Sequence, residues 1–502
     1  MMGNNCLLKF RIRHGACGAP QAGLPSVKQR GAQKKMARHD YYGILYRKLL
    51  FPVYDRLIKR RTIHSSFLEI SRNPWIPLPE LREIQREKLQ KLLGYCGRHV
   101  PYYRRLFEET GLDVEKGVDM DELRARGIFT SKEIVKSAGA DLRSDAFSPR
   151  ELRRKVSSGS TGTPIQLHVT LDYWCLQMAT KYRAESWIGK AIGTPTTYVW
   201  GHRLDLDPLK RLKVSLYWRL QNYQFVSAFD VGEEALIADI GRIKRFGPRF
   251  IESYVSPVYL MARLIEERGI EPPKLDGIVT GGESLFDFQR EQIERSFRCP
   301  VYNRYGSSEF MSVAHECSAH RGMHINADGF IVEVLDGAGQ PVVGEEGDIV
   351  ITDLNNYATP LIRYRIADRG ILSDRICFCG RTFPLIEKIM GRVSDAMKAP
   401  DGHELHSMYF HWRVRLIPGI YRFQVVQKTV DKLEIRVMHD GSTMREETEK
   451  RILDAFRDLK EHGVSMTLTY VDDIPLARSG KMNFFVSEMP EPGMPRPGGG
   501  DE

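Results

Sequence analysis

The sequence predicts an α/β fold, with a large N-terminal domain of parallel sheets and a β-rich subdomain, followed by a small mobile α+β C-terminal domain. Between residues 152 and 305, short apolar or β-branched runs alternate with helical stretches, which is typical of βαβ units and parallel strands. Hairpin-like runs follow from residue 329, and a separate strand–helix–strand pattern occupies residues 422–471. A chain of 502 residues is long enough for at least two domains.

We expect four segments along the chain. Residues 1–35 are rich in Gly, Arg and Lys and lack the apolar core of a signal peptide, so they are interpreted as a disordered basic extension or as an untranslated stretch before Met36. Residues 36–391 form the predicted N-terminal domain, and residues 392–487 form the C-terminal lid domain. The Pro-, Gly- and acid-rich residues 488–502 are expected to be a disordered tail.

Helices are expected to open the N-terminal domain. Residues 40–63 are aromatic, basic and amphipathic. We favour packing of this helix against the rest of the protein, with contact to an anionic membrane surface as the alternative. A second helix is predicted over residues 78–94, with Pro101 ending it or starting a turn, and short helices follow between residues 119 and 137.

The central region is expected to alternate strands and helices. We predict strands at residues 152–156, 165–169, 196–200, 250–254, 277–280 and 301–306, and helices at residues 171–187, 233–246, 257–268 and 286–297. Two hairpin strands, 330–335 and 347–352, follow. The last domain is predicted to contain paired strands 422–429 and 432–438, helix 446–462 and strand 466–471.

Composition excludes several classes of protein. The net charge is +10, but no aromatic-rich basic platform or zinc-finger spacing accompanies it, so no nucleic-acid partner is predicted. No apolar run reaches transmembrane length. The eight cysteines are scattered except for Cys377 and Cys379, which argues against a disulfide framework and for the cytoplasm. The sequence contains no indication of the oligomeric state.

A loop of small hydroxyl residues and glycines lies between the first two predicted strands. Its backbone N–H groups could approach a polyphosphate closely, and its hydroxyls could donate further hydrogen bonds. The loop matches neither the Walker loop nor the dinucleotide fingerprint, and a Ser/Gly-rich surface hairpin is the alternative interpretation. The residues expected to hold phosphate are Ser157, Ser158, Gly159, Ser160, Thr161 and Gly162.

Four further segments carry residues suited to nucleotide chemistry. Tyr305-Gly306-Ser307-Ser308-Glu309 combines an aromatic ring, a hydroxyl and a carboxylate, which can stack on a base, bind a phosphate and hold Mg²⁺. Asp368 can accept hydrogen bonds from both ribose hydroxyls. Residues 391–395 lie at the predicted domain boundary, where a hinge would be placed. Lys481 follows Ser-Gly near the end of the chain, where a mobile ammonium could offset negative charge.

In this order the segments resemble the adenylate-forming superfamily, which includes acyl-CoA synthetases, adenylation domains and luciferases. More narrowly, the chain resembles the phenylacetate–CoA ligase family, including its members associated with capsular polysaccharide loci. The residues that carry the narrower resemblance are His99-Val100-Pro101-Tyr102-Tyr103, Pro360-Leu361-Ile362-Arg363-Tyr364-Arg365 and Cys377-Phe378-Cys379-Gly380-Arg381-Thr382. The resemblance extends from about residue 75 to residue 485.

The resemblance implies a two-step reaction and a role for each matching residue. A carboxylate attacks the α-phosphate of ATP to give an acyl-adenylate and pyrophosphate, and a thiol, usually that of coenzyme A, then displaces AMP. The resemblance implies that Ser308 contacts the α-phosphate, that Glu309 binds Mg²⁺ and that Lys481 serves adenylation. It also implies nucleoside contacts and a hinge, which it assigns to Gly282 and Glu283 beside adenine, Tyr305 and Gly306 at the base, Asp368 at the ribose, Arg392 near the phosphates, and Asp395 at the hinge.

Departures from the family pattern leave the acceptor open. Ile165 and Gln166 follow Pro164 where a lysine is often found, and Ile366-Ala367 precede Asp368 in place of Thr-Gly. We expect an AMP-forming acid–thiol ligase that acts on a small aryl carboxylic acid. Its acyl pocket is expected near residues 196–200, 225–229 and 281–285. The alternatives are an adenylyltransferase resembling coenzyme F390 synthetases, an acyl transferase acting on a carrier-protein thiol or a sugar amine, and a non-catalytic nucleotide-binding protein.

A cysteine–histidine set suggests a zinc site. Cys377 and Cys379 form a tight thiolate pair, and Cys317 and His324 could complete a tetrahedral Cys₃His set. His315 and His320 are rival ligands, and buried thiols with surface histidines are the alternative. Relatives in the phenylacetate branch share the arrangement, which implies that the zinc is structural.

Overall fold

The computed structural model describes most of the chain between residues 41 and 489. The described residues are 41–156, 165–201, 208–228, 232–392, 396–401, 404–406, 410, 413–414, 417–460, 462–475 and 484–489. The chain divides into two compact units, Met1–Tyr41 and Tyr42–Glu502. The second unit contains all the elements described below, and the boundary predicted at residue 391 stays a prediction.

Successive short helical segments open this unit. They are α1 (Tyr41–Leu45), η2 (Tyr46–Leu50), α2 (Phe51–Val53) and η3 (Tyr54–Ile58). The helix predicted over residues 40–63 therefore ends at Ile58, and Ile63 starts a new helix, α3 (Ile63–Ile70). Tyr46 and Phe51 are buried in one cluster with residues of α8 (Leu171–Ser186), so one side of the segment packs as expected.

A helical layer follows in α4 (Leu78–His99), α5 (Pro101–Thr110), α6 (Met120–Ala125) and α7 (Lys132–Ala138). A turn was one expectation for Pro101, but this proline is the first residue of helix α5. Proline suits this position because the first N–H of a helix has no intrahelical partner and the fixed φ is already helical. The Tyr103 hydroxyl then donates to the carbonyl oxygen of Pro360 at 3.1 Å, which links α5 to the segment before β13.

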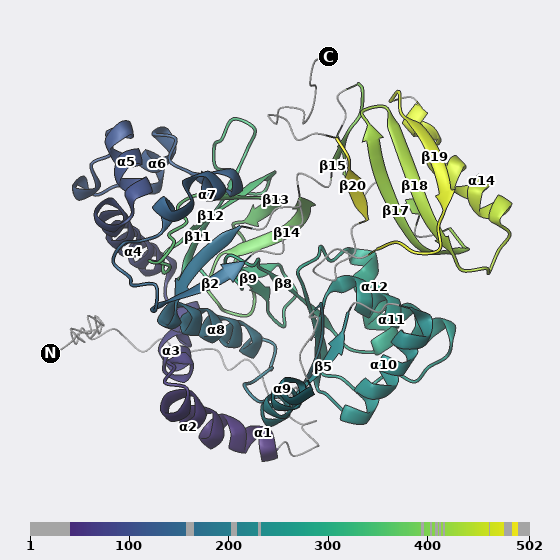
Figure 1. Ribbon diagram of the computed structural model, residues 1–502, viewed down its shortest axis with the longest axis horizontal. Coiled ribbons are helices and arrows are strands. Elements are labelled where there is room, and N and C mark those ends of the chain that lie inside the picture. Colours follow the sequence, from purple (N-terminus) through teal and green to yellow (C-terminus); the bar gives the residue numbers. More distant parts are fainter. Residues whose placement is uncertain are drawn as a thin grey trace. The chain divides into compact units, whose positions relative to one another are not determined.

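A single twelve-stranded mixed sheet forms the centre of the unit (Figure 1). Five strands are parallel, in the order β5 (Tyr223–Ser227), β4 (Thr196–Trp200), β6 (Phe250–Ser253), β7 (Gly277–Gly281) and β8 (Val301–Tyr305). The sheet continues antiparallel through β9 (Ala314–Glu316), β10 (Met323–Ile325), β14 (Leu385–Arg392), β13 (Tyr364–Ser373), β12 (Glu346–Asp353) and β11 (Phe330–Leu335), while β1 (Thr130–Ser131) pairs with β13. The α/β class is confirmed, and the β-rich part proves continuous with the parallel strands.

The parallel strands carry different layers on their two faces. α10 (Glu233–Phe246), α11 (Val255–Glu267) and α12 (Asp287–Phe297) lie together on one side (Figure 1) and bury Val199, Ile251, Ile278 and Val301. The alternate strand residues face the other side, where α8 supplies Lys181 to contact Glu252. α9 (Pro208–Leu220) and β5 were not predicted as elements.

A small hairpin flanks the hydroxyl/glycine loop. The two predicted strands are confirmed as β2 (Leu152–Val156) and β3 (Gln166–Thr170), and they pair antiparallel, with Val156 opposite Gln166. The loop between them lies outside the described residues. The hairpin therefore fixes where the loop begins and ends.

The C-terminal part forms its own sheet and core. β15 (Ala396–Lys398) pairs with β16 (Glu404–His406), and a second sheet has the order β19 (Ser465–Tyr470), β18 (Lys432–His439), β17 (Ile420–Thr429), β20 (Phe485–Ser487). The helix predicted over residues 446–462 is divided into α14 (Arg445–Ala455) and the 3₁₀ turn η8 (Arg457–Lys460). Val425, Ile435 and Ile452 are fully buried in a separate cluster, as expected for an α+β unit. No described helix has the length and hydropathy needed to cross a membrane.

Candidate functional site

The carboxyl ends of β7 and β8 bring two predicted segments to one edge of the sheet. The strands are parallel neighbours, with Gly281 opposite Arg304, so Gly282 and Tyr305 follow at the same edge. Ligands of open α/β sheets bind at such edges. Gly282 has φ +80°, and a Cβ at Gly306 would overlap the carbonyl oxygen of Met311, so both positions require glycine.

The carboxylate of Glu283 is fixed by the start of α11. Its Oε2 accepts hydrogen bonds from the Ser256 backbone N at 2.7 Å and from the Ser256 Oγ at 2.9 Å. Donors of the first turn of a helix have no intrahelical partners and favour negative charge. The predicted adenine-bordering residue is therefore held in one position. The contribution of Ser256 was not foreseen from the sequence.

The predicted base and ribose contacts meet directly. The Tyr305 hydroxyl donates to Oδ2 of Asp368 at 2.8 Å, across 63 residues of sequence. Asp368 lies in β13 opposite Arg392 of β14, so the backbones of all three predicted residues converge. The hydrogen bond holds one carboxylate oxygen of Asp368 in place and orients the carboxylate.

The turn after β8 lies beside the end of β2. Ser308 is exposed and Glu309 is half-buried in this turn. Lys155 of β2 donates from Nζ to Oε1 of Gln177 at 2.9 Å and to the carbonyl oxygen of Glu309 at 3.4 Å. Burial lowers the pKa of Lys155 to about 8, against the opposing effect of Asp353 and Glu309. A lysine two residues before the hydroxyl/glycine loop was the signal that the sequence offered for this residue.

Several predicted residues cannot be placed. Ser157, Ser158, Gly159, Ser160, Thr161, Gly162, Asp395 and Lys481 lie outside the described residues. Arg392 lies in β14, but its side chain is not described. Their assigned roles stay predictions.

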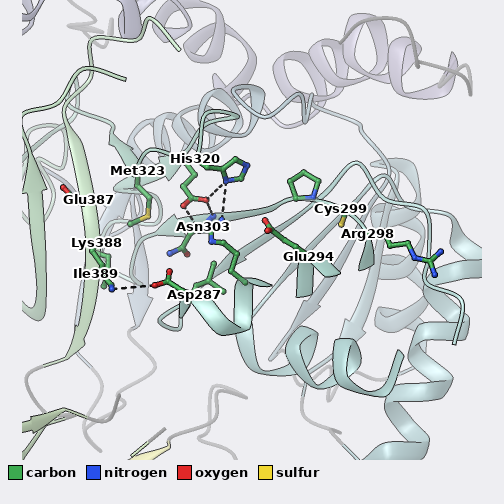
Figure 2. Close-up of a pocket in the computed structure, with 15 residues that line it drawn as sticks. Asp287, Glu294, Arg298, Cys299, Asn303, His320, Met323, Glu387, Lys388 and Ile389 are labelled. Carbon is green, nitrogen blue, oxygen red and sulfur yellow. Dashed lines mark hydrogen bonds and ion pairs between the residues drawn. The ribbon is translucent and has the colours of Figure 1, made fainter. Parts of the chain in front are cut away.

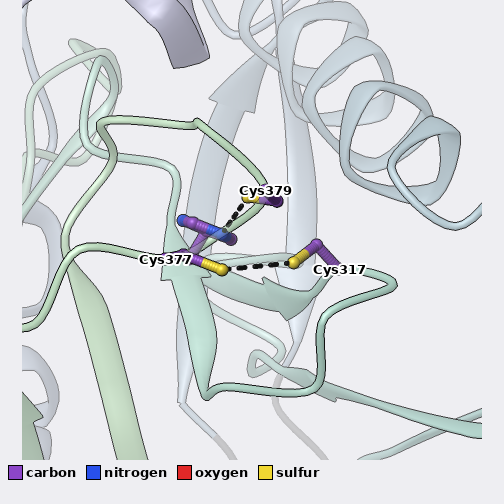
Figure 3. Close-up of side chains that lie close together, drawn as sticks. Cys317, Cys377 and Cys379 are labelled. Carbon is purple, nitrogen blue, oxygen red and sulfur yellow. Dashed lines mark hydrogen bonds between the residues drawn. The ribbon is translucent and has the colours of Figure 1, made fainter. Parts of the chain in front are cut away.

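The four predicted zinc ligands converge, and Figure 3 shows the three cysteines among them close together. Cys317 follows β9, His324 lies in β10, and Cys377 and Cys379 precede β14. The four ligand atoms lie within 4.8 Å of one another. The Sγ atoms of Cys317 and Cys377 are 3.7 Å apart, and Sγ of Cys379 is 3.2 Å from Nε2 of His324. Bonds of about 2.0–2.3 Å to one central Zn²⁺ would give separations of this size.

The surroundings of His324 leave its Nε2 atom available to bind a metal ion. Its Nδ1 lies 3.0 Å from the carbonyl oxygen of Phe383, which can accept the ring proton and leave the Nε2 lone pair toward the thiols. A hydrogen bond from Cys317 lowers the pKa of Cys379, and the same bond raises the pKa of the Cys317 thiol. Among the described residues, the rivals His315 and His320 are not members of this cluster.

A cavity of about 890 Å³ lies elsewhere, along α12 and the adjoining strands (Figure 2). Arg290 contacts Glu316 at 2.6 Å, and Lys388 lies 4.0 Å from Asp287. The cavity lining therefore contains two pairs of opposite charges. Leu285, the last residue of the expected acyl region, reaches this cavity, but no residue assigned to the nucleotide lines it. The cavity therefore adds no group to the nucleotide site.

The chain is similar to known proteins in sequence and in fold. Residues 397–488 match the CapK C-terminal domain family. The chain is 29% identical over 380 residues to the phenylacetate-coenzyme A ligase of Thermus thermophilus, covering 72% of this chain and 82% of the relative. It is 20% identical over 458 residues to the protein CapK of Staphylococcus aureus, covering 90% and 99%.

A solved ligase structure and a further relative are also similar to this chain. The structure matches a 2-hydroxyisobutyryl-CoA ligase with a TM-score of 0.67 at 19% identity, over 83% of this chain and 91% of that one, which shows a common fold. The phenylacetate-coenzyme A ligase of Aromatoleum evansii is 30% identical over 342 residues, covering 63% of this chain and 72% of the relative. The chain belongs to the phenylacetate–coenzyme A ligase family.

Proposed function

We propose that the protein is an AMP-forming carboxylate–coenzyme A ligase for a small aryl acid. The acid's carboxylate oxygen bonds to the α-phosphorus of ATP while the bond to pyrophosphate breaks. The thiol of coenzyme A then forms a thioester with the acyl carbon, and AMP leaves. The observation that carries the proposal is the Tyr305–Asp368 hydrogen bond beside Gly282 and Gly306, because it joins groups for a base and a ribose at one sheet edge. Family membership supports the same reaction.

The nucleoside would lie against the described residues of this edge. The ring of Tyr305 offers an aromatic face to adenine. Asp368 would accept from the ribose hydroxyls, with its carboxylate oriented by the Tyr305 hydroxyl. Gly282 and Glu283 would border the base, and Gly306 lets the backbone come close. We assign Arg392 to the ribose–phosphate side.

Negative charge develops around the α-phosphorus during adenylation, so cations and oriented donors are the useful groups. Ser308 would donate to the α-phosphate, and Glu309 would coordinate Mg²⁺ with the phosphates. Ser157 to Gly162 would hold the triphosphate, and Lys481 would serve adenylation. Lys155, next to Glu309, places a further cation just before that loop.

We propose that Cys317, His324, Cys377 and Cys379 hold one Zn²⁺. Four protein ligands leave no open position, so the ion would be structural. It would join the β9–β10 turn to the segment between β13 and β14. Because β13 carries Asp368 and β9 follows Glu309, the ion would fix the strands on either side of the nucleotide site.

The C-terminal domain over residues 392–487 would act as a lid that turns about Asp395 between the two steps. Its separate core supports an independent folding unit. We place the enzyme in the cytoplasm, where ATP and coenzyme A are available. The described cysteines are unpaired as disulfides, which agrees with a reducing compartment.

A second candidate function is peripheral membrane contact through residues 40–63. Residues 41–63, the part of this segment that the structure describes, carry six basic residues and one acid, Asp55, which is 2% exposed. Leu49, Leu57 and Ile58 are 54%, 69% and 65% exposed. Helical residues that present apolar and basic side chains without an exposed acid in this described part suit an anionic lipid surface.

Vesicle co-sedimentation tests the membrane candidate. We expect binding to vesicles with anionic lipid, weaker binding to zwitterionic vesicles, and loss of binding in a Leu49→Glu/Leu57→Glu variant. Leu453→Glu, at another exposed leucine, serves as the matched control. Equal sedimentation of the two variants would reject this candidate.

Carboxylate-dependent ATP–pyrophosphate exchange across aryl, fatty and sugar acids tests the ligase. Exchange with aryl acids, followed by thioester formation with coenzyme A, is the expected result. Exchange without thioester would indicate another acceptor. A stable AMP-modified product without acid-dependent exchange would indicate an adenylyltransferase.

A further inference from the structure

Five charged side chains are buried together on the α8 face of the parallel strands. Lys181 and Glu185 come from α8, Lys190 from the segment after it, Glu252 from β6 and Arg304 from β8. Arg304 immediately precedes Tyr305, and Glu252 lies next to the carboxyl end of its strand. The cluster therefore lies at the sheet edge that carries the proposed nucleotide site, on the face that α8 covers.

Short contacts connect the five groups through the carboxylates. Glu252 binds Arg304 at 2.6 Å and Lys181 at 2.9 Å through Oε1, and Lys190 at 3.0 Å through Oε2. Glu185 contacts Lys190 at 2.9 Å and Lys181 at 3.3 Å. Burial opposes ionisation of Glu252, but the three cations outweigh it and hold its pKa well below its ordinary value. Both carboxylates are thus fully used by the cations of the cluster.

The cluster carries one more cation than carboxylate. Within the described part of the chain, Lys181, Lys190 and Arg304 form ion pairs only with Glu185 and Glu252. A buried charge is costly unless it is paired, and the cost falls when an anion arrives. An uncompensated positive charge at this depth therefore favours an anionic ligand.

The two least buried members of the cluster are both cations. The side chains of Lys190, Glu185 and Glu252 are 2–3% exposed, whereas those of Lys181 and Arg304 are 12% and 11% exposed. Arg304 donates to Glu252 through Nη1, whereas its Nε and Nη2 have no hydrogen-bond partner among the described residues. Those two nitrogens lie against Gly281, where an added Cβ would be 3.4 and 3.6 Å away. Donors remain available beside the glycine turn that follows β7.

Aromatic rings lie beside Arg304 and Lys181, although the Lys181 ammonium already contacts Glu252, Glu185 and, at 3.5 Å, the Tyr198 hydroxyl. The guanidinium of Arg304 lies 5.8 Å from the ring centroid of Trp200, which stacks on Tyr254 at 4.1 Å. Lys181 lies 5.1 Å from the ring centroid of Tyr198. Flat rings beside the Nε and Nη2 donors of Arg304 suit a flat ligand that carries a negative charge.

We propose that Arg304, assisted by Lys181, binds a second anionic group on the acid substrate, which makes the substrate an aromatic acid with an additional negatively charged substituent. The inference rests on the proposed ligase function and names the substrate class of that site. The reacting carboxylate must reach the phosphates near Ser308 and Glu309, which follow β8 beyond Tyr305. Arg304 precedes Tyr305, and its side chain lies on the α8 face of the sheet. It therefore contacts a part of the substrate other than the reacting carboxylate.

The test compares phenylacetate with 4-carboxyphenylacetate in ATP–pyrophosphate exchange by wild-type protein, Arg304→Met and Arg304→Lys. Arg304→Met leaves two lysines facing two glutamates, so the remaining cluster is neutral. We expect kcat/KM for the dianionic acid to fall at least about 30-fold, with less than about threefold change for phenylacetate. Arg304→Lys is expected to retain part of the preference, because it keeps the charge.

Equal losses for both acids, or an unchanged preference, would overturn the inference. Calorimetric measurement of the binding of both acids distinguishes failure of this inference from failure of the proposed ligase function. Arg304-dependent binding of the dianionic acid without exchange would reject the ligase and retain the site, whereas binding indifferent to Arg304 would reject the site. Should Arg304→Met not fold, Lys181→Met and Arg304→Lys give the same comparison, and an unchanged preference in both overturns the inference.

Discussion

Tyr305 combines two tasks in the proposed nucleotide site, since its ring would face adenine while its hydroxyl orients Asp368. We expect Tyr305→Phe to raise the KM for ATP about fivefold with little change in kcat, because one hydrogen bond worth about 1 kcal/mol is lost while the ring remains. Steady-state exchange kinetics measure the effect. Tyr302→Phe, on the same strand, is the matched control. An unchanged KM for ATP would argue against the orienting role.

Asp353 gives the protein a predicted pH dependence. The carboxyl is 1% exposed at the end of β12, and burial raises its pKa from 3.8 to about 6, although Tyr173 and the Asn355 N–H donate to it. Between about pH 4 and pH 6 the folded protein keeps this proton while the unfolded chain loses it. The contribution of Asp353 to the free energy of unfolding therefore falls as pH rises through that range, by about 3 kcal/mol.

Asp353→Asn, which is neutral at every pH, should lack this decline. Denaturant unfolding at pH 4 and pH 7 is expected to show the variant gaining about 3 kcal/mol relative to wild type between the two values. Parallel stability curves for the two proteins would contradict the assignment.

At the scale of elements, the four proposed zinc ligands link strands that are short on their own. β9 and β10 have three residues each, so their geometry depends on the connections around them. Purified protein is expected to contain one equivalent of zinc, and Cys377→Ser should lose it and unfold at a lower temperature. Cys299→Ser, at a buried cysteine outside the cluster, is the control. Absence of metal from the wild-type protein would end the zinc proposal.

Local sequence patterns predicted many elements, but they missed short strands and also longer elements such as α9 and β14. Helix α10 and strands β4 and β11 were predicted with the observed bounds because their apolar periodicity is strong. β9 and β10 were missed, since three residues carry too little periodicity. The helix after β18 is shorter than predicted, because the pattern does not distinguish an α-helix from a following 3₁₀ turn.

At the scale of the whole molecule, the proposed reaction divides between a large domain that binds and a lid that supplies Lys481. We expect Lys481→Ala to abolish adenylation, measured as acid-dependent pyrophosphate release, while ATP binding is retained, because the lysine acts only when charge develops at the α-phosphorus. Lys428→Ala, at a partly exposed lysine of β17 in the same predicted domain, is the matched control. Normal pyrophosphate release by Lys481→Ala would show the role to be wrong.

The sequence by itself determined the α/β class, and it predicted the order of the proposed nucleotide-binding segments and the four candidate zinc ligands, because each depends on short stretches of neighbouring residues. Only the tertiary structure decided that the parallel and antiparallel strands form one sheet, that Tyr305 bonds to Asp368, and that Arg304 joins a cluster with surplus positive charge. These features depend on strand register and on side chains that meet across 50 residues or more. Periodicity within a segment carries no information about which segment lies opposite.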